Sequence, residues 1–449
     1  MTTKMRAIRG LLTLAWALFC LQMAHAGLPI QHWTQPNGAR VWLVESPAIP
    51  MVDVQIDFDA GGRRDLAQQA GLAAVMAGML SKGVAARGTD AALDENQLGE
   101  AWADLGASFG AGAGGDRMSL SLRSLTEPDL LERAVALAAR QIAEPSFPDA
   151  VWVRERERLA ASIREANTRP ATIAGRAFGQ GVYGDHPYGY EMTEATLARI
   201  AVGDLRALHA RMILPCRAKV SIVGALTRAQ ADALVTRLLG RLPAGDAAAC
   251  APLPAVGEVA PLQAAQEWRL PFDSAQAHVL IGQPGYKRDD PDYFALLVGN
   301  YTLGGGGFVS RLTQEVREKR GLSYSVYSYF SPGLHAGAFT LGLQTRPDQA
   351  DQAVQVSREV VARFVAEGPT EAELQAARDN LVGGFALRID SNRKLLDNLA
   401  NIGWHRLPLD YLDSWTQKVE KVTVADIRSA FARKLQPQRM VTVVLGAKP

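Results

Sequence analysis

Residues 200–225 read IAVGDLRALHARMILPCRAKVSIVGA, and residues 422–447 read VTVADIRSAFARKLQPQRMVTVVLGA. The two stretches align without a gap at an offset of 222 residues, and nine of the 26 positions are identical. Each copy has apolar residues at helical spacing, then a proline that stops the helix, then a β-branched run typical of a strand. The offset is far longer than the period of a solenoid repeat. We therefore expect two duplicated domains.

The rest of the chain fits this division. Residues 243–262 are rich in Ala and Pro and lack periodicity, which favours an extended connection. We expect an N-terminal domain at 27–242, a linker at 243–262 and a C-terminal domain at 263–449. In each domain, strand patterns stand beside long helical ones, which indicates the α+β class, with an antiparallel-rich sheet covered by helices.

Five of the expected helices bear on function. Helices are expected at 66–81, 93–105, 149–167, 293–303 and 310–319. A patch of small residues at 110–115, GAGAGG, precedes a strand expected at 117–124. This patch could widen the entrance to a binding site, but its glycines favour a turn.

The first 26 residues have the pattern of a secretory signal peptide. A basic start is followed by an uncharged apolar run over 11–21 and by Ala24-His25-Ala26, a small-x-small cleavage signal. We expect cleavage near Ala26 and a periplasmic or secreted product. A lipoprotein signal ending at Cys20 is the alternative.

Charge and cysteine content limit the possible functions. The net charge is +2, and the leader holds three of the basic residues, so the remaining chain is close to neutral. This balance argues against a nucleic-acid partner, and without a second long apolar run we expect no stable membrane insertion. Cys216 and Cys250 could form a disulfide in an oxidising compartment, or could remain unpaired thiols.

Several stretches, taken together in order and spacing, resemble the M16 (pitrilysin-like, or inverzincin) peptidase family along nearly the whole chain after the leader. They are AGGRRD (60–65), GLAAVMAGMLSKG (71–83), ERERLAASI (155–163), DHPYGY (185–190) and LGGGGFVSRLTQEVREKRGLSYSV (303–326), with the two strand ends SIVGA and TVVLGA. The resemblance implies duplicated α+β halves around a peptide-binding chamber. In the family, the sheet edge that matches 110–115 pairs with the substrate backbone.

The resemblance also implies a zinc site that this chain has lost. Family enzymes place His-x-x-Glu-His on the helix that matches 66–81, and those positions here are Ala74, Ala77 and Gly78. The third ligand, a Glu on a later helix, falls near Ser162, with Glu155 and Glu157 one to two turns before it. No two of the seven histidines are three to five residues apart, so the motif cannot be written elsewhere. We expect no metal or other cofactor on this chain.

A second family feature is retained. In the family, an Arg and a Tyr seven residues later approach the zinc site of the catalytic half, and the Tyr helps hold the substrate carbonyl. Arg317 and Tyr324 fit this spacing. The alternative is a basic helix terminus followed by an ordinary strand tyrosine. The nearby Gly304, Gly305, Gly306 and Gly307 lack the ending of a phosphate loop and suit a packed or flexible turn before a helix capped by Ser310. We take these glycines as candidate substrate-binding residues.

Lost ligands beside a retained Arg and Tyr predict a division of labour. We expect the non-catalytic subunit of a periplasmic M16-type heterodimer, in which a homologous His-x-x-Glu-His chain holds the zinc and the two chains enclose a peptide substrate. A stand-alone peptide-binding or chaperone-like homodimer is the first alternative. An active hydrolase with a different metal site or nucleophile is the second.

Overall fold

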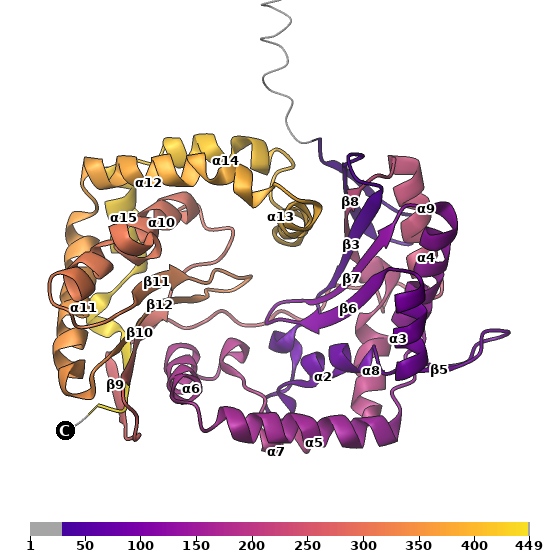
Figure 1. The fold of residues 1–449 in the computed structure, drawn as a ribbon, viewed down its shortest axis with the longest axis horizontal. Coiled ribbons are helices and arrows are strands. Elements are labelled where there is room, and N and C mark those ends of the chain that lie inside the picture. The colour runs from indigo at the N-terminus through magenta and orange to yellow at the C-terminus, as the bar shows by residue number, and fades with distance from the viewer. Residues whose placement is uncertain (1–28, 448–449) are drawn as a thin grey trace, which may run out of the picture.

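A computed structural model describes residues 29–447 as two halves that lie side by side, each built on its own sheet (Figure 1). The predicted signal peptide lies outside the described residues. Within them, no helix is long and apolar enough to cross a membrane. The predicted α+β class is confirmed.

The first half contains a six-stranded sheet in the order β1-β2-β8-β3-β7-β6. Only the β2–β8 pair is parallel. Its strands are β1 (Gln31–Thr34), β2 (Arg40–Glu45), β3 (Met51–Phe58), β6 (Ser108–Ala113), β7 (Met118–Leu125) and β8 (Lys219–Gly224). A short ribbon of β4 (Gly83–Val84) and β5 (Leu93–Asp94) stands apart.

The second half repeats this order with one strand fewer. Its five-stranded sheet runs β11-β12-β10-β13-β9, and only the β13–β9 pair is parallel. The strands are β9 (Gln266–Leu270), β10 (Ala277–Pro284), β11 (Val326–Phe330), β12 (Ala338–Thr345) and β13 (Val441–Leu445). By this order, edge strand β11 corresponds to edge strand β6.

The sequence repeat occupies equivalent places in the two halves. Helix α8 (Val202–Met212) leads into β8, and helix α15 (Val424–Lys434) leads into β13. The carboxylates of Asp204 and Asp426 accept hydrogen bonds from backbone N–H groups at the starts of their helices, at 2.8 and 2.9 Å. The predicted helix-then-strand order of both copies is confirmed.

The remaining helices lie around the two sheets. In the first half they are α2 (Leu72–Met79), α3 (Glu95–Asp104), α4 (Pro128–Ala143), α5 (Asp149–Ala166), α6 (Pro170–Tyr183), α7 (Glu194–Leu197) and α9 (Arg228–Leu239). In the second they are α10 (Tyr293–Asn300), α11 (Ala350–Glu367), α12 (Glu371–Gly383), α13 (Asn392–His405) and α14 (Tyr411–Glu420).

Each half has one helix that packs on the sheet of the other half. Helix α6 packs on β10 and β13 of the second half, and α13 packs on β8 and β3 of the first (Figure 1). Glycines allow both close approaches. A Cβ at Gly181 of α6 would come within 2.8 Å of Val441, and one at Gly403 of α13 within 3.0 Å of Trp42. The two halves are therefore interlocked.

Two expected helices differ from their predicted form. The segment at 66–81 contains a 3₁₀ turn, Ala67–Gln69, and only then α2, because Gly71 takes a left-handed φ of 101° directly before the helix. The helix expected at 310–319 is mostly a π-helix, Thr313–Glu318.

The turn favoured at 110–115 was a wrong interpretation. Four of these residues, Gly110 to Ala113, belong to β6, where pairing with β7 overrides the low strand propensity of glycine. Only Gly114 and Gly115 lie in the turn that follows.

The linker is held against the first half. Cys216 and Cys250 form a disulfide with a Cα–Cα distance of 5.9 Å. Arg217 also donates hydrogen bonds to the carbonyl oxygens of Ala249 and Ala251 in this segment.

Candidate functional site

Helix α2 carries the three positions that correspond to the lost zinc motif. Ala74 and Gly78 are exposed on one face, as residues four apart on a helix must be, whereas Ala77 is buried. A Cβ placed on Gly78 would meet nothing within 4 Å, so there is room for a side chain. The face keeps the shape of a ligand-bearing helix but holds no metal-binding group.

Helix α5 supplies the opposite wall. A cavity of about 120 Å³ lies between the two helices, lined by Ala74 and Gly78 of α2, by Lys82, and by Glu155 and Arg158 of α5. Ser162 does not line this cavity. It lies seven residues beyond Glu155, which is about 10 Å along the helix axis. Glu155, and not Ser162, therefore faces Ala74 and Gly78 across this cavity, and the assignment of Ser162 to the third ligand position stays a prediction.

The carboxylate of Glu155 is surrounded by cations. Its oxygens lie 3.3 Å from the ammonium of Lys82, 2.9 Å from the guanidinium of Arg158 and 3.2 Å from that of Arg154. Burial alone would raise the pKa of Glu155, but the hydrogen bonds from Arg158 and Arg154 and the charge of Lys82 hold it below its usual value. Lys82 also contacts Glu95 at 3.1 Å.

These residues do not fit a zinc ion. Such a site needs at least three protein ligands, and this cavity offers one carboxylate already engaged in three ion pairs. Across residues 29–447, no group of three His, Cys, Asp or Glu side chains is placed to hold a metal. No step of metal-dependent chemistry can be assigned to this half.

A larger cavity adjoins the first, because Ala74 lines both. It measures about 470 Å³ and lies between α2, the end of β6, the turn at Pro187–Gly189 and the loop 331–333 of the second half. Asp65 lines this cavity and accepts hydrogen bonds from the backbone N–H of Gly71, at 2.9 Å, and of Ala73, at 3.1 Å. Burial raises the pKa of Asp65 to about 6, although these bonds oppose the shift.

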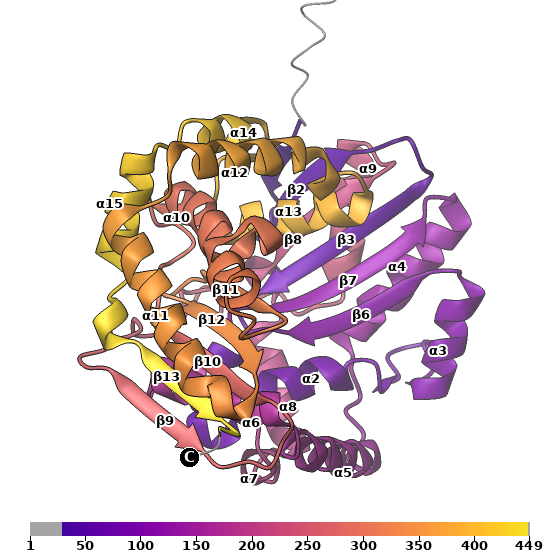
Figure 2. The ribbon, with the colours of Figure 1, turned by 60° about the vertical axis from the view of Figure 1, so that its left-hand side comes forward.

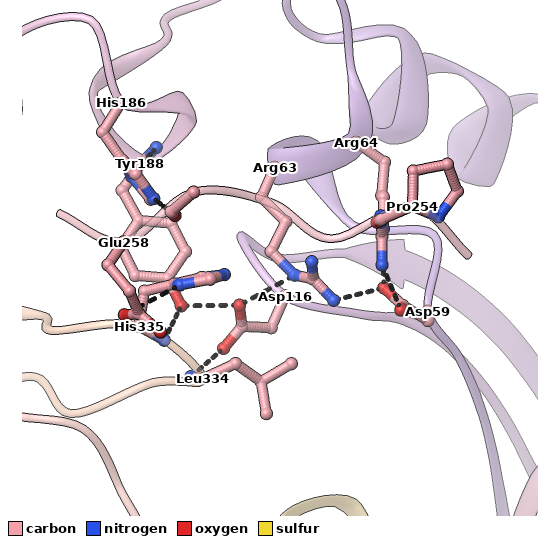
Figure 3. A network of polar contacts seen from close by, with 11 residues as sticks. Asp59, Arg63, Arg64, Asp116, His186, Tyr188, Pro254, Glu258, Leu334 and His335 are labelled. Atoms are coloured by element: carbon pink, nitrogen blue, oxygen red, sulfur yellow. Dashed lines mark hydrogen bonds and ion pairs between the residues drawn. The ribbon is translucent and has the colours of Figure 1, made fainter. Parts of the chain in front are cut away.

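A polar network joins the two halves beside this cavity (Figure 3). The carboxylate of Asp116 accepts hydrogen bonds from the hydroxyl of Tyr188, at 2.6 Å, and from the backbone N–H of Leu334, at 2.9 Å. It also forms an ion pair with Arg63 at 3.2 Å. The Tyr188 hydroxyl in turn accepts from the backbone N–H of His335 at 3.1 Å. Burial and the neighbouring Asp116 raise the pKa of Tyr188, so its hydroxyl remains a donor.

Strand β6 leaves one edge of the first sheet open next to this cavity. It is the last strand of its sheet and pairs only with β7 (Figure 2). Ala113 at its end and Gly114 directly after it line the cavity. The backbone groups on its outer side pair with no other described strand. An extended peptide could therefore add to this edge.

Arg317 and Tyr324 are brought together in the second half. The guanidinium carbon of Arg317 lies 4.9 Å from the centre of the Tyr324 ring and 4.7 Å from that of Phe308. The Tyr324 side chain is 83% exposed, and its hydroxyl forms no hydrogen bond with a residue in 29–447. The pair thus presents a free phenol held by a stacked guanidinium.

The glycine run, Gly304 to Gly307, directly precedes Phe308 in the chain. Gly304 is buried against β11, where a Cβ would lie 2.4 Å from the Ser328 hydroxyl oxygen. Gly307 takes a left-handed φ of 61°, and Phe308 follows it directly. Gly304 and Gly305 end a π-helix, Tyr301–Gly305, and Gly307 begins the 3₁₀ turn Gly307–Val309 that carries Phe308. The role of the four glycines as substrate-binding residues stays a prediction.

Sequence reasoning missed three participants. They are Lys82, Tyr188 and Phe308, and each lies within a stretch that resembles the family. A signal for Phe308 did exist, because an apolar aromatic directly after four glycines is a candidate exposed contact.

The chain is similar in sequence and in fold to several known proteins. The sequence profile described as the peptidase M16 inactive domain matches residues 199–381. A crystal structure described as the peptidase M16 inactive domain from Pseudomonas fluorescens shares 33% identity, covers 94% of this chain and 99% of its own, and superposes with a TM-score of 0.87.

Two relatives by sequence bear contrasting descriptions. An uncharacterized zinc protease of Mycobacterium leprae is 29% identical over 92% of this chain and 91% of its own. The non-peptidase homolog YmxG of Helicobacter pylori is 26% identical over 87% of this chain and 88% of its own.

Proposed function

The chain belongs to the peptidase M16 family, and we propose that it is the non-catalytic subunit of a zinc metallopeptidase heterodimer. The observation that carries this proposal is the contrast between its two halves. The α2–α5 cavity has no imidazole and a carboxylate neutralised by Lys82, Arg158 and Arg154. The Arg317–Tyr324 pair, by contrast, is assembled and exposed.

In this proposal the metal and its activated water belong to a homologous chain with an intact His-x-x-Glu-His. This chain contributes hydrogen-bond donors. The Tyr324 hydroxyl donates to the carbonyl oxygen of the scissile peptide bond as negative charge develops on it. Arg317 stacks on the Tyr324 ring and limits the directions in which the phenol can point. Its positive charge also favours the developing oxyanion.

The first half would form part of the wall of the peptide chamber. The open edge of β6 and the cavity of about 470 Å³ beside it provide backbone hydrogen-bonding groups and space for an extended peptide. Because this wall lacks catalytic groups, a peptide bound there would be held and not cut.

We place the complex in the periplasm or outside the cell. The disulfide between Cys216 and Cys250 supports an oxidising compartment, in which such bonds persist. The basic and apolar character of residues 1–26 supports export.

Reconstitution tests the proposal. The purified chain, a homologous His-x-x-Glu-His chain and their mixture would be assayed for zinc content and for hydrolysis of an unstructured peptide library. We expect no stoichiometric zinc and no hydrolysis with this chain alone, a stable one-to-one complex on mixing, and hydrolysis in the mixture well above that of the partner alone. Stoichiometric zinc or peptidase activity in this chain alone would overturn the proposal.

The open β6 edge also favours a second candidate, a stand-alone peptide-binding homodimer. Strand addition at that edge requires no partner. Sedimentation analysis separates the two candidates, because the second requires a self-associated species that retains peptide and gains nothing from the zinc-bearing chain.

A further inference from the structure

We propose that a third cavity, which lies between the two halves and adjoins the peptide cavity at Gly333, binds a ligand that bears a carboxylate or phosphate group. The cavity measures about 540 Å³. The first half contributes the starts of β2 and β8, the linker contributes 250–253, and the second half contributes the end of α13 and the loop 333–334. We call it the basic cavity.

Positive charge dominates the lining of the basic cavity. Five basic side chains and two carboxylates line it, which leaves an excess of three positive charges when Lys219 is protonated and of two when it is neutral. The cationic residues are Arg40, Arg64, Arg217, Lys219 and Arg406, and the acidic ones are Asp59 and Asp289. Asp59 is already engaged, at 2.5 Å by Arg63 and at 2.7 Å by Arg64.

Two of these cations have no anionic neighbour. Arg40 and Arg406 form no side-chain hydrogen bond or ion pair with any residue in 29–447, although both line a cavity. Arg40 also lies directly beside Lys219 in the parallel register of β2 and β8. Like charges at adjacent positions of a sheet are destabilising, so the arrangement costs folding energy unless an anion compensates it.

Burial and the neighbouring positive charges lower the pKa values of three cavity residues, Lys219, Arg40 and Arg217. Burial, then the charges of Arg40 and Arg406, lower the pKa of Lys219 to about 7. Burial and the charge of Arg406 lower that of Arg40. Burial first, then Arg64 and Arg211, lower the pKa of Arg217, against the attraction of Asp59. The Arg217 Nε is buried without a hydrogen-bond partner.

Contacts within the local structure explain only some of the cationic residues that line the basic cavity. Lys219 donates a hydrogen bond to the carbonyl oxygen of Trp404 at 2.9 Å, which satisfies an orphan carbonyl in the last turn of α13. Arg217 holds the linker, as described above. The left-handed φ of 55° at Arg406 ends α13, where its backbone N–H donates to the carbonyl oxygen of Ile402. None of these roles accounts for the side chains of Arg40 and Arg406.

An oxyanion in the basic cavity would supply the negative charge and the hydrogen-bond acceptors that Arg40 and Arg406 lack. Guanidinium groups match the planar oxygens of carboxylate and phosphate and can bind them through two parallel hydrogen bonds. The ligand would contact Arg40 and Lys219 of the first half together with Arg406 of the second. Its binding would therefore stabilise the contact between the two halves.

Calorimetric titration of the purified chain at constant ionic strength tests this proposal. The probes are inorganic phosphate, tripolyphosphate, and one peptide made with a free or an amidated C-terminus. We expect saturable binding of at least one oxyanion probe, weakened about tenfold or more by either Arg40→Gln or Arg406→Gln. Arg346→Gln removes an exposed, paired arginine outside the cavity and should leave affinity unchanged.

The probes also identify the source of the ligand. Preference for tripolyphosphate indicates a free phosphate compound, and preference for the free-acid over the amidated peptide indicates a peptide C-terminus. The proposal is overturned if no probe binds saturably, or if Arg346→Gln weakens binding as much as the cavity variants do.

Melting temperature without ligand gives an independent readout. Removal of an uncompensated charge should leave the melting temperature of Arg40→Gln and Arg406→Gln equal to or above that of the wild type. A clear fall in both would show that the two arginines are structural and would overturn the proposal.

Discussion

The ammonium of Lys82 lies 3.3 Å from the carboxylate of Glu155, in the cavity where the family places its metal. Together with Arg154 and Arg158, it supplies the positive charge that keeps Glu155 ionised. A set of ion pairs therefore links α5 to the segment that directly follows α2.

Restoring two histidines should restore zinc binding. Ala74→His and Gly78→His, combined with Lys82→Met, would place two imidazoles and the Glu155 carboxylate around one cavity, a set known to bind zinc. We expect about one zinc per chain by elemental analysis after dialysis. Adding Glu155→Gln should abolish this binding, and adding Ser162→Ala should not. Zinc retention in the Glu155→Gln background would show that the third position has been assigned wrongly.

Asp65 should make stability depend on pH in the acid range. Its pKa is raised from 3.8 to about 6 in the folded state. The folded chain thus binds this proton more tightly than the unfolded chain. Its stabilising contribution is fully present below pH 3.8 and is lost as the pH rises through 6.

Asp65→Asn is the variant that isolates this effect. It keeps an oxygen acceptor for the N–H groups of Gly71 and Ala73, and it should remove a loss on the order of 2 kcal/mol between these pH values. Urea denaturation of both proteins at pH 4 and pH 7 measures the difference. Equal pH dependence in the wild type and the variant would contradict the assignment.

The exchanged helices should couple the two halves into one unfolding unit. Phe178 of α6 is 7% exposed and packs against the sheet of the second half. Phe178→Ala should lower the free energy of unfolding by about 3 kcal/mol, while Gln180→Ala on the exposed side of α6 should change it little. Calorimetry should show one transition for the wild type. Two well-separated transitions would mean that the halves fold independently.

Much of the architecture could be predicted from local pattern. The repeat that contains Asp204 and Asp426 predicted equivalent helix-strand units, because capping residues, a proline stop and a β-branched run are all local signals. The exchange of α6 and α13 could not be predicted in this way. Which sheet a helix covers depends on long-range packing, such as that of Gly403 against Trp42, and not on periodicity.

The candidate functional site could also be predicted only in part from the sequence. The absence of histidine at positions 74 and 78 is read directly from the sequence. The resemblance also indicated Arg317 and Tyr324 together, and their side chains are in contact. The sequence did not show that Glu155, and not Ser162, faces α2. Glu155 and Ser162 are seven residues apart, nearly two full turns, so helical periodicity assigns both to one face. Only the position of α2 along α5 decides between them.

The shared active site is tested most directly by the activity of the reconstituted heterodimer with Tyr324→Phe. Loss of one oxyanion donor should lower kcat about a hundredfold with little change in KM. Tyr327→Phe, a half-exposed tyrosine on the adjacent strand β11, serves as the matched control and should leave both constants unchanged. A Tyr324→Phe complex as active as the wild type would contradict the account.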